Sequence, residues 1–151
     1  LRGVPEVYNA AGEYNLILTI ESPVESNDVQ GGFRVIISQG EMIADGWQIM
    51  DGGYTHTDEI NDRRQWEVVW VAPEADDELA TFVVHGNAVN GNGNSNGDEW
   101  NSMSIAVPGV NYTGEVTTPD VTAKEVTGIQ LAVGVIGIVI LLSLAFYAIK
   151  D

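Results

Sequence analysis

Apolar and polar residues alternate along short stretches of residues 1–107, and this two-residue period is the pattern of β-strands. The clearest case is residues 66–71, where Trp66, Val68 and Trp70 occupy alternate positions. About seven short strands with no helical period predict an all-β domain, an antiparallel β-sandwich. The expected strands, separated by turn-forming stretches, are residues 4–8, 14–20, 33–38, 47–50, 54–57, 66–71, 79–85 and 100–107.

Large aromatic side chains at the alternating positions indicate where the core should form. Trp66 and Trp70 lie on the same strand an even number of residues apart, so both side chains should face the same side. Each buried aromatic contributes about 2 to 3 kcal/mol of burial free energy. The predicted core residues are Phe33, Trp66, Trp70, Phe82 and Trp100.

A long apolar run, residues 126–149, follows the β-rich region and contains no Asp, Glu, Lys, Arg or His. A helix of this length covers roughly 36 Å, enough to cross a hydrocarbon core of about 30 Å. A buried core helix is the alternative, but core helices rarely run so far without polar residues. The run therefore predicts a single transmembrane helix in contact with membrane lipid. Its small residues, which would let another helix pack closely, are Gly128, Ala132, Gly134 and Gly137.

These patterns divide the chain into an extracytoplasmic β-sandwich at residues 1–107, a stalk at 108–125, the transmembrane helix at 126–149 and a short cytoplasmic tail at 150–151. Because the chain begins with Leu rather than Met, we expect a signal segment upstream of it. The expected location is the cell membrane, with a single pass and the N-terminal domain outside. The stalk contains an Asn-Tyr-Thr sequon, which makes Asn111 a predicted glycosylation site.

The charge balance is strongly acidic, since 22 Asp and Glu residues against 6 Lys and Arg residues give a net charge of −16. Such a surface repels phosphates, which excludes nucleic acid as a partner. It suits saline surroundings, where counter-ions screen the repulsion between carboxylates. The chain has no cysteine, so the domain is held by its core without disulfides or thiolate metal sites.

The most biased stretch, residues 86–99, is rich in Asn and Gly and ends in Asp98 and Glu99. Amide and carboxylate oxygens are the ligands that calcium prefers, and the spacing resembles the start of an EF-hand loop. However, Met103 stands where the bidentate glutamate belongs, and Asn and Gly also dominate ordinary turns. A structural loop and a weak calcium site both stay open, and no other cofactor is expected. The candidate calcium ligands are Asn90, Asn92, Asn94, Asn96, Asp98 and Glu99.

No set of residues in the sequence marks a catalytic site. His56 and His85, the only 2 histidines, fall on separate expected strands with no third ligand or nucleophile near either, so structural roles are expected. The carboxylates of residues 76–78 are adjacent on a polar turn, where side chains splay apart into water. We therefore expect a protein that is not an enzyme.

A succession of motifs extends from about residue 3 to residue 107. It comprises residues 14–19, Gly31-Gly32-Phe33, Thr55-His56-Thr57, Trp66 with Trp70, Ala72-Pro73, Phe82, Gly86-Asn87, Asn90-Gly91 and Gly97-Asp98. In this order the motifs resemble the reelin-like domain, which occurs in prokaryotes as the choice-of-anchor V domain. The resemblance implies an immunoglobulin-like β-sandwich on a secreted or surface protein, fixed to the cell by varying anchors and without a common enzymatic activity. Members of that family often carry a Cys-x-x-Cys-His haem motif just upstream of the segment that resembles residues 1–8.

Three functions are compatible with these observations. The favoured one is a non-catalytic, membrane-anchored accessory subunit whose sandwich caps or binds a larger integral membrane protein complex. The first alternative is the tether domain of a surface electron-transfer protein with its haem motif upstream of Leu1, and its support is the family resemblance alone. The second alternative is a cell-surface adhesion or binding module built on the same sandwich.

Overall fold

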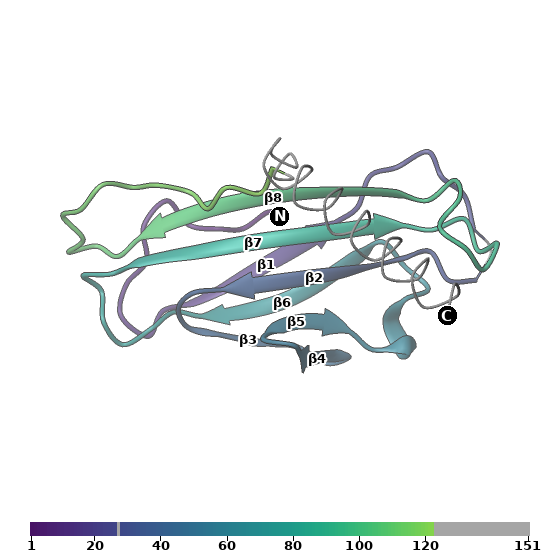
Figure 1. Cartoon of the computed structure of the whole chain (residues 1–151). Helices are drawn as coiled ribbons and strands as arrows, with labels where there is room; N and C mark the ends of the chain where they lie inside the picture. Colours follow the sequence, from purple (N-terminus) through teal and green to yellow (C-terminus); the bar gives the residue numbers. More distant parts are fainter. Residues whose placement is uncertain (27, 123–151) are drawn as a thin grey trace, which may run out of the picture. The chain divides into compact units, whose positions relative to one another are not determined.

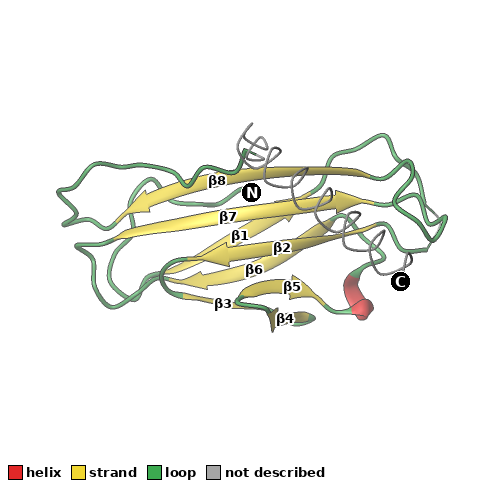
Figure 2. Ribbon diagram, in the orientation of Figure 1, coloured by secondary structure: helices red, strands yellow, loops and turns green. Residues whose placement is uncertain are grey.

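The computed structural model describes residues 1–26 and 28–122, and the regular secondary structure of this part of the chain is β-strand apart from one 3₁₀ turn (Figures 1 and 2). The strands are β1 (Glu13–Thr19), β2 (Gly31–Ile37), β3 (Glu41–Ile43), β4 (Trp47–Met50), β5 (Gly53–His56), β6 (Gln65–Val71), β7 (Leu79–Ala88) and β8 (Glu99–Pro108), with one 3₁₀ turn, η1 (Asp58–Ile60). The predicted transmembrane helix at 126–149, with its small residues and the tail, lies outside the described residues. Within the described residues, no helix has the length and apolarity needed to span a bilayer.

The strands form two antiparallel sheets, as the alternating pattern predicted. The smaller has the order β1-β6-β3, and the larger has the order β4-β5-β2-β7-β8 (Figure 2). In the smaller sheet β6 pairs on both sides, with Leu16 opposite Val68 and Met42 opposite Trp70. In the larger sheet β7 pairs along its whole length with β8, from Leu79 to Ala88. The short strand β3 was not expected from the sequence, because three residues are too few to show alternation.

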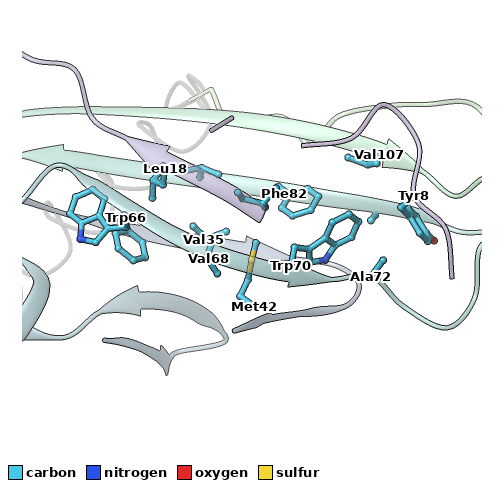
Figure 3. Close-up of a cluster of buried hydrophobic side chains, with 14 residues drawn as sticks. Tyr8, Leu18, Val35, Met42, Trp66, Val68, Trp70, Ala72, Phe82 and Val107 are labelled. Carbon is cyan, nitrogen blue, oxygen red and sulfur yellow. The ribbon is translucent and has the colours of Figure 1, made fainter. Parts of the chain in front are cut away.

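The core lies between the two sheets, where alternate side chains of both meet (Figure 3). The indole of Trp70 on β6 makes an edge contact with Phe82 on β7, with ring centroids 4.9 Å apart. Phe33 on β2 contacts Trp66 on β6 at the same centroid distance of 4.9 Å. All four of these predicted core residues are buried. The two aromatic pairs thus join the sheets at two points along β6.

The fifth predicted core residue, Trp100, is not in the core. Its side chain is 73% exposed, so the prediction from alternation is wrong at this position. Trp100 lies near the start of β8, directly opposite Asn87. Because β8 is the last strand of the larger sheet and Trp100 lies on the side that faces away from the smaller sheet, no layer of the sandwich covers the indole.

Both ends of the sandwich domain pack against its edges. The N-terminal segment is tied to the sheets by bridges from Arg2 to Ile17 and from Tyr8 to Gly109, rather than forming the expected strand at 4–8. Beyond β8, the backbone of Asn111 donates to the carbonyl of Asp76, and Ser104 donates to the carbonyl of Pro119 at 2.7 Å. The compact unit runs from Leu1 to Val121 and includes the residues that follow β8.

Candidate binding surfaces

The outer face of the larger sheet carries a hollow with a volume of about 370 Å³, here called the histidine groove. The register of the strands brings the lining residues together, since Gly32 lies opposite Asn87 and Arg34 lies opposite His85. Asn87 lies in turn opposite Trp100, so strands β2, β7 and β8 each contribute to one continuous surface. The lining residues are Val29, Gly31, Gly32, Phe33, Arg34, His56, His85, Gly86, Asn87, Val89 and Trp100.

The glycine pair at the start of β2 shapes the groove. A Cβ on Gly32 would lie 2.1 Å from Nε2 of His56, so the imidazole occupies the space that a side chain would fill. A Cβ on Gly31 would lie 2.4 Å from the backbone oxygen of Asn87, which cannot move aside as a side chain can. The glycines thus let His56 fold over β2, with its ring centroid 5.7 Å from that of Phe33.

Each histidine has one ring nitrogen fixed by a neighbour. Nδ1 of His56 lies 3.2 Å from the carbonyl oxygen of Thr57, and Nδ1 of His85 lies 2.7 Å from Oγ of Ser102. A carbonyl oxygen can only accept, so Nδ1 of His56 carries the hydrogen and Nε2 of the neutral ring is a hydrogen-bond acceptor. Within the described part of the chain, neither Nε2 atom has a hydrogen-bond partner. The histidines, expected to be only structural, therefore meet at one groove with unpaired nitrogens.

The charge of the groove differs from that of the chain. None of the lining residues, all of them in the described ranges, is Asp or Glu, although the chain has 22 acidic residues. Arg34 is the one permanently charged lining residue, and its guanidinium donates to the backbone oxygen of Asp51. The groove is therefore a neutral to weakly basic surface on an acidic protein.

A second candidate surface is the β4 edge, defined here as the residues of β4. β4 is the edge strand of the larger sheet and pairs only with β5, so one side of its backbone has no strand partner in the described structure. On this strand Ile49 is 71% exposed and Met50 50%. Exposed Asp45 and Asp51 flank the strand at its two ends. An edge strand with exposed apolar side chains favours the addition of a strand from another protein.

The Asn-rich loop between β7 and β8 is held by its own side chains. Oδ1 of Asn90, Asn92 and Asn94 each accepts the backbone N–H two residues further on, at 2.9 to 3.0 Å. Oδ1 of Asp98 accepts the backbone N–H of Asn90 at 3.1 Å, while Glu99 accepts from Ser22 at 2.7 Å. Two of the amide groups, those of Asn90 and Asn92, converge on the carbonyl of Asn96. These bonds explain the loop as a chain of turns, and the calcium site stays a prediction.

The carboxylates at residues 76–78 lie on the turn that the sequence predicted, and this turn anchors the N-terminal segment. The Tyr8 hydroxyl donates to the carbonyl oxygens of Ala75 and Glu78, both at 3.0 Å. Burial, and then the nearby Glu78 carboxylate, raise the pKa of Tyr8 above its ordinary value. Asn111, the predicted glycosylation site, is exposed, and its side-chain amide donates a hydrogen bond to the carboxylate of Asp76 at 3.0 Å. Glycan attachment at Asn111 stays a prediction.

Sequence reasoning did not find the histidine groove or the β4 edge. The signal for the groove was the Gly31-Gly32 pair inside a stretch of strand, since glycine in a strand marks a close approach of another group. No comparable signal marks Ile49, because an edge strand and a central strand have the same alternation. Which side of β4 lacks a partner depends on the order of strands, which residue spacing does not encode.

Comparison with known proteins gives structural neighbours only. No protein-family model matches the chain, and no curated protein matches it. Among solved structures, one crystal structure of the human F-spondin reeler domain (fragment 2) is similar with a TM-score of 0.45 and 16% identity, covering 72% of this chain and 87% of that one. Fragment 1 of the same domain gives 0.42 and 19%, covering 60% and 72%, and the Reelin-N domain of F-spondin gives 0.40 and 22%, covering 58% and 67%. Scores and identities this low assign neither a family nor a function to the chain.

Proposed function

We propose that this protein is a non-catalytic, reelin-like module with an immunoglobulin-like sandwich, held outside the cell membrane as an accessory subunit of a larger integral membrane complex. The observation that carries the proposal is the β4 edge, where Ile49 is 71% exposed on a strand with one unpaired side. An apolar edge of this kind is an aggregation hazard unless a partner covers it. Docking on a larger protein gives the edge a function and removes the hazard.

The nature of the partner segment follows from the chemistry of the edge. A strand added beside β4 would bond to its free backbone groups and place apolar side chains against Ile49 and Met50. The exposed carboxylates of Asp45 and Asp51 at the two ends favour Lys or Arg on either side of that segment. A second copy of this chain is disfavoured, because two surfaces that each belong to a chain of net charge −16 repel one another.

A binding role suits the way that charged groups are placed. No charged residue of the described chain is buried. Enzymes commonly hold a catalytic acid or base in a partly dry site that shifts its pKa. The two described ion pairs, Arg2 with Glu21 and Arg63 with Asp62, are both on the surface. This distribution favours recognition of a partner over acid–base chemistry.

Attachment to the membrane is the part of the proposal that rests on sequence. The uncharged run at 126–149 would cross the bilayer and contact lipid, with the sandwich outside and Lys150 and Asp151 inside. Its small residues would let the helix pack against helices of the same complex. Adhesion through the histidine groove is the second candidate function, because that groove offers an exposed indole and unpaired imidazole nitrogens.

The test is co-purification from the native membrane. The intact protein, solubilised in mild detergent, should elute with a stable stoichiometric partner. Ile49→Asp should abolish this association while leaving the free energy of unfolding within about 0.5 kcal/mol of wild type, because the residue is on the surface. Trp100→Ala, a change to the other exposed surface, is the matched control and should retain the partner. A lone monomer, or a complex that survives Ile49→Asp unchanged, would overturn the proposal. A haem absorbance band on the intact chain would support the electron-transfer tether instead.

A further inference from the structure

We propose that the histidine groove binds a neutral sugar ring, with the ring stacked on Trp100 and its hydroxyl groups bonded to the imidazoles. This inference goes beyond the docking function and uses a different surface of the sandwich. The groove is on the outer face of strands β2, β7 and β8, whereas the docking surface is at the β4 edge. The two can therefore succeed or fail separately.

The indole of Trp100 is the first requirement for sugar recognition. It is 73% exposed and borders the groove, while Trp66 and Trp70 are buried in the core. An aromatic ring of this size removes a large apolar area from water when a flat ligand covers it. A pyranose ring has such a face, made of its axial C–H groups. The exposed indole thus favours a ligand that is flat and apolar on one side.

The polar groups of the groove specify what the edges of the ligand carry. Nε2 of His56 accepts hydrogen bonds, because Nδ1 donates to the carbonyl of Thr57. A ligand at this nitrogen must therefore donate, as a hydroxyl does and a carboxylate does not. Asn87 lies between Gly32 and Trp100 in the register and adds an amide that both donates and accepts. Hydroxyl groups, which also donate and accept, match this mixed set.

Charge separates a neutral ligand from an ionic one. A polyanion is repelled by the net charge of −16 on the chain. A cation finds no carboxylate in the lining, and it meets Arg34 there instead. A neutral polyhydroxyl compound escapes both penalties. The hollow of about 370 Å³ is within the usual size range for small-ligand sites and is open, which suits one or two residues of a longer chain.

The test is a fluorescence titration of the purified intact chain. The probes are neutral hexasaccharides of β-1,4-glucose, β-1,3-glucose and β-1,4-mannose, with an oligouronate as the anionic comparison and choline as the cationic one. At least one neutral sugar should change the tryptophan emission saturably, at a millimolar or tighter Kd. Trp100→Ala should weaken that binding at least about tenfold, because the stacking surface is lost.

Two further variants make the outcome specific. Gly32→Ala should displace the His56 ring and weaken sugar binding by about tenfold, as measured by calorimetry, while Ile49→Ala at the β4 edge should bind sugar as wild type does. Far-UV circular dichroism checks that each variant is folded. The proposal is overturned if no neutral sugar binds at millimolar concentration, if the oligouronate or choline binds more tightly than every neutral sugar, or if Trp100→Ala binds as wild type does. None of these results bears on co-purification through the β4 edge, so the two functions are tested independently.

Discussion

Strands β6 and β8 carry three of the chain's 4 tryptophans, and they place them in opposite surroundings. On β6, Trp66 and Trp70 are buried between the sheets. On β8, Trp100 is 73% exposed on the outer face of the larger sheet. The same side chain thus stabilises the fold in one strand and is available to a ligand in the other. The difference comes from the face of the sheet on which each side chain lies, because Trp66 and Trp70 point between the sheets and Trp100 points away from them.

This contrast shows what residue alternation does and does not determine. A two-residue period predicts that a segment is a strand and which side chains share a face. It does not determine which of the two faces the other sheet covers, and a shift of one residue exchanges them. On β6 both tryptophans were assigned correctly because Val68, between them, is buried on the same face. On β8 the buried position is Val107, an odd number of residues from Trp100, so the indole must face outward.

A substitution on β6 should cause the largest loss of stability. Trp70→Ala removes a fully buried indole that contacts Tyr8, Tyr14 and Phe82. We expect a loss of about 3 to 5 kcal/mol in the free energy of unfolding, measured by urea denaturation, because a large cavity replaces the ring. A loss below about 1 kcal/mol would contradict the position of Trp70 at the centre of the core.

Two glycine variants on β2 compare a clash with the backbone and a clash with a side chain. Gly31→Ala should cost about 1 to 3 kcal/mol of stability, because its Cβ would meet a backbone oxygen that is fixed by the sheet. Gly32→Ala should cost less, about 0.5 to 1 kcal/mol, because the His56 ring can swing away from the new Cβ. Thermal unfolding of the two variants checks this order. Equal costs would show that His56 is as rigidly held as the backbone.

The buried hydroxyl of Tyr8 should contribute a smaller amount. Tyr8→Phe keeps the ring but removes the donor to the carbonyls of Ala75 and Glu78, and we expect a loss of about 1 to 2 kcal/mol. The pKa of Tyr8 is raised above its ordinary value of 10.0, so its contribution is fully present below pH 10 and is lost as the pH rises through the raised pKa. Urea denaturation at neutral and alkaline pH should therefore show a smaller alkaline loss in Tyr8→Phe. The same alkaline loss in both proteins would contradict this role.

Calcium should affect the Asn-rich loop by at most about 1 kcal/mol, the linkage expected for a millimolar site in millimolar calcium. The bound is low because the loop offers only Asp98 and Glu99 as carboxylates, and both already accept hydrogen bonds. Scanning calorimetry with calcium and with chelator measures the shift in melting temperature. A rise equivalent to several kcal/mol would show a dedicated calcium site, and no shift would leave a purely structural loop.

The sequence predicted the features that depend on neighbouring residues, and it did not predict those that depend on contacts between distant segments. Seven of the eight expected strands form with boundaries close to those predicted, because turn residues mark their ends. The exception is residues 4–8, whose Pro5 lacks the N–H needed for regular pairing. The meeting of His56 with His85 required knowledge that β5 and β7 both flank β2. Packing of residues 109–121 beside β8 likewise depends on tertiary contacts such as Ser104 with Pro119.

We infer that β8 presents its tryptophan for binding while β6 uses its own for folding. The stability of Trp100→Ala, measured by urea denaturation beside Trp70→Ala, tests this difference directly. Trp100→Ala should therefore unfold within about 0.5 kcal/mol of wild type, far from the loss expected of Trp70→Ala. A loss of about 2 kcal/mol or more at Trp100 would show that the indole supports the fold, and it would contradict the claim.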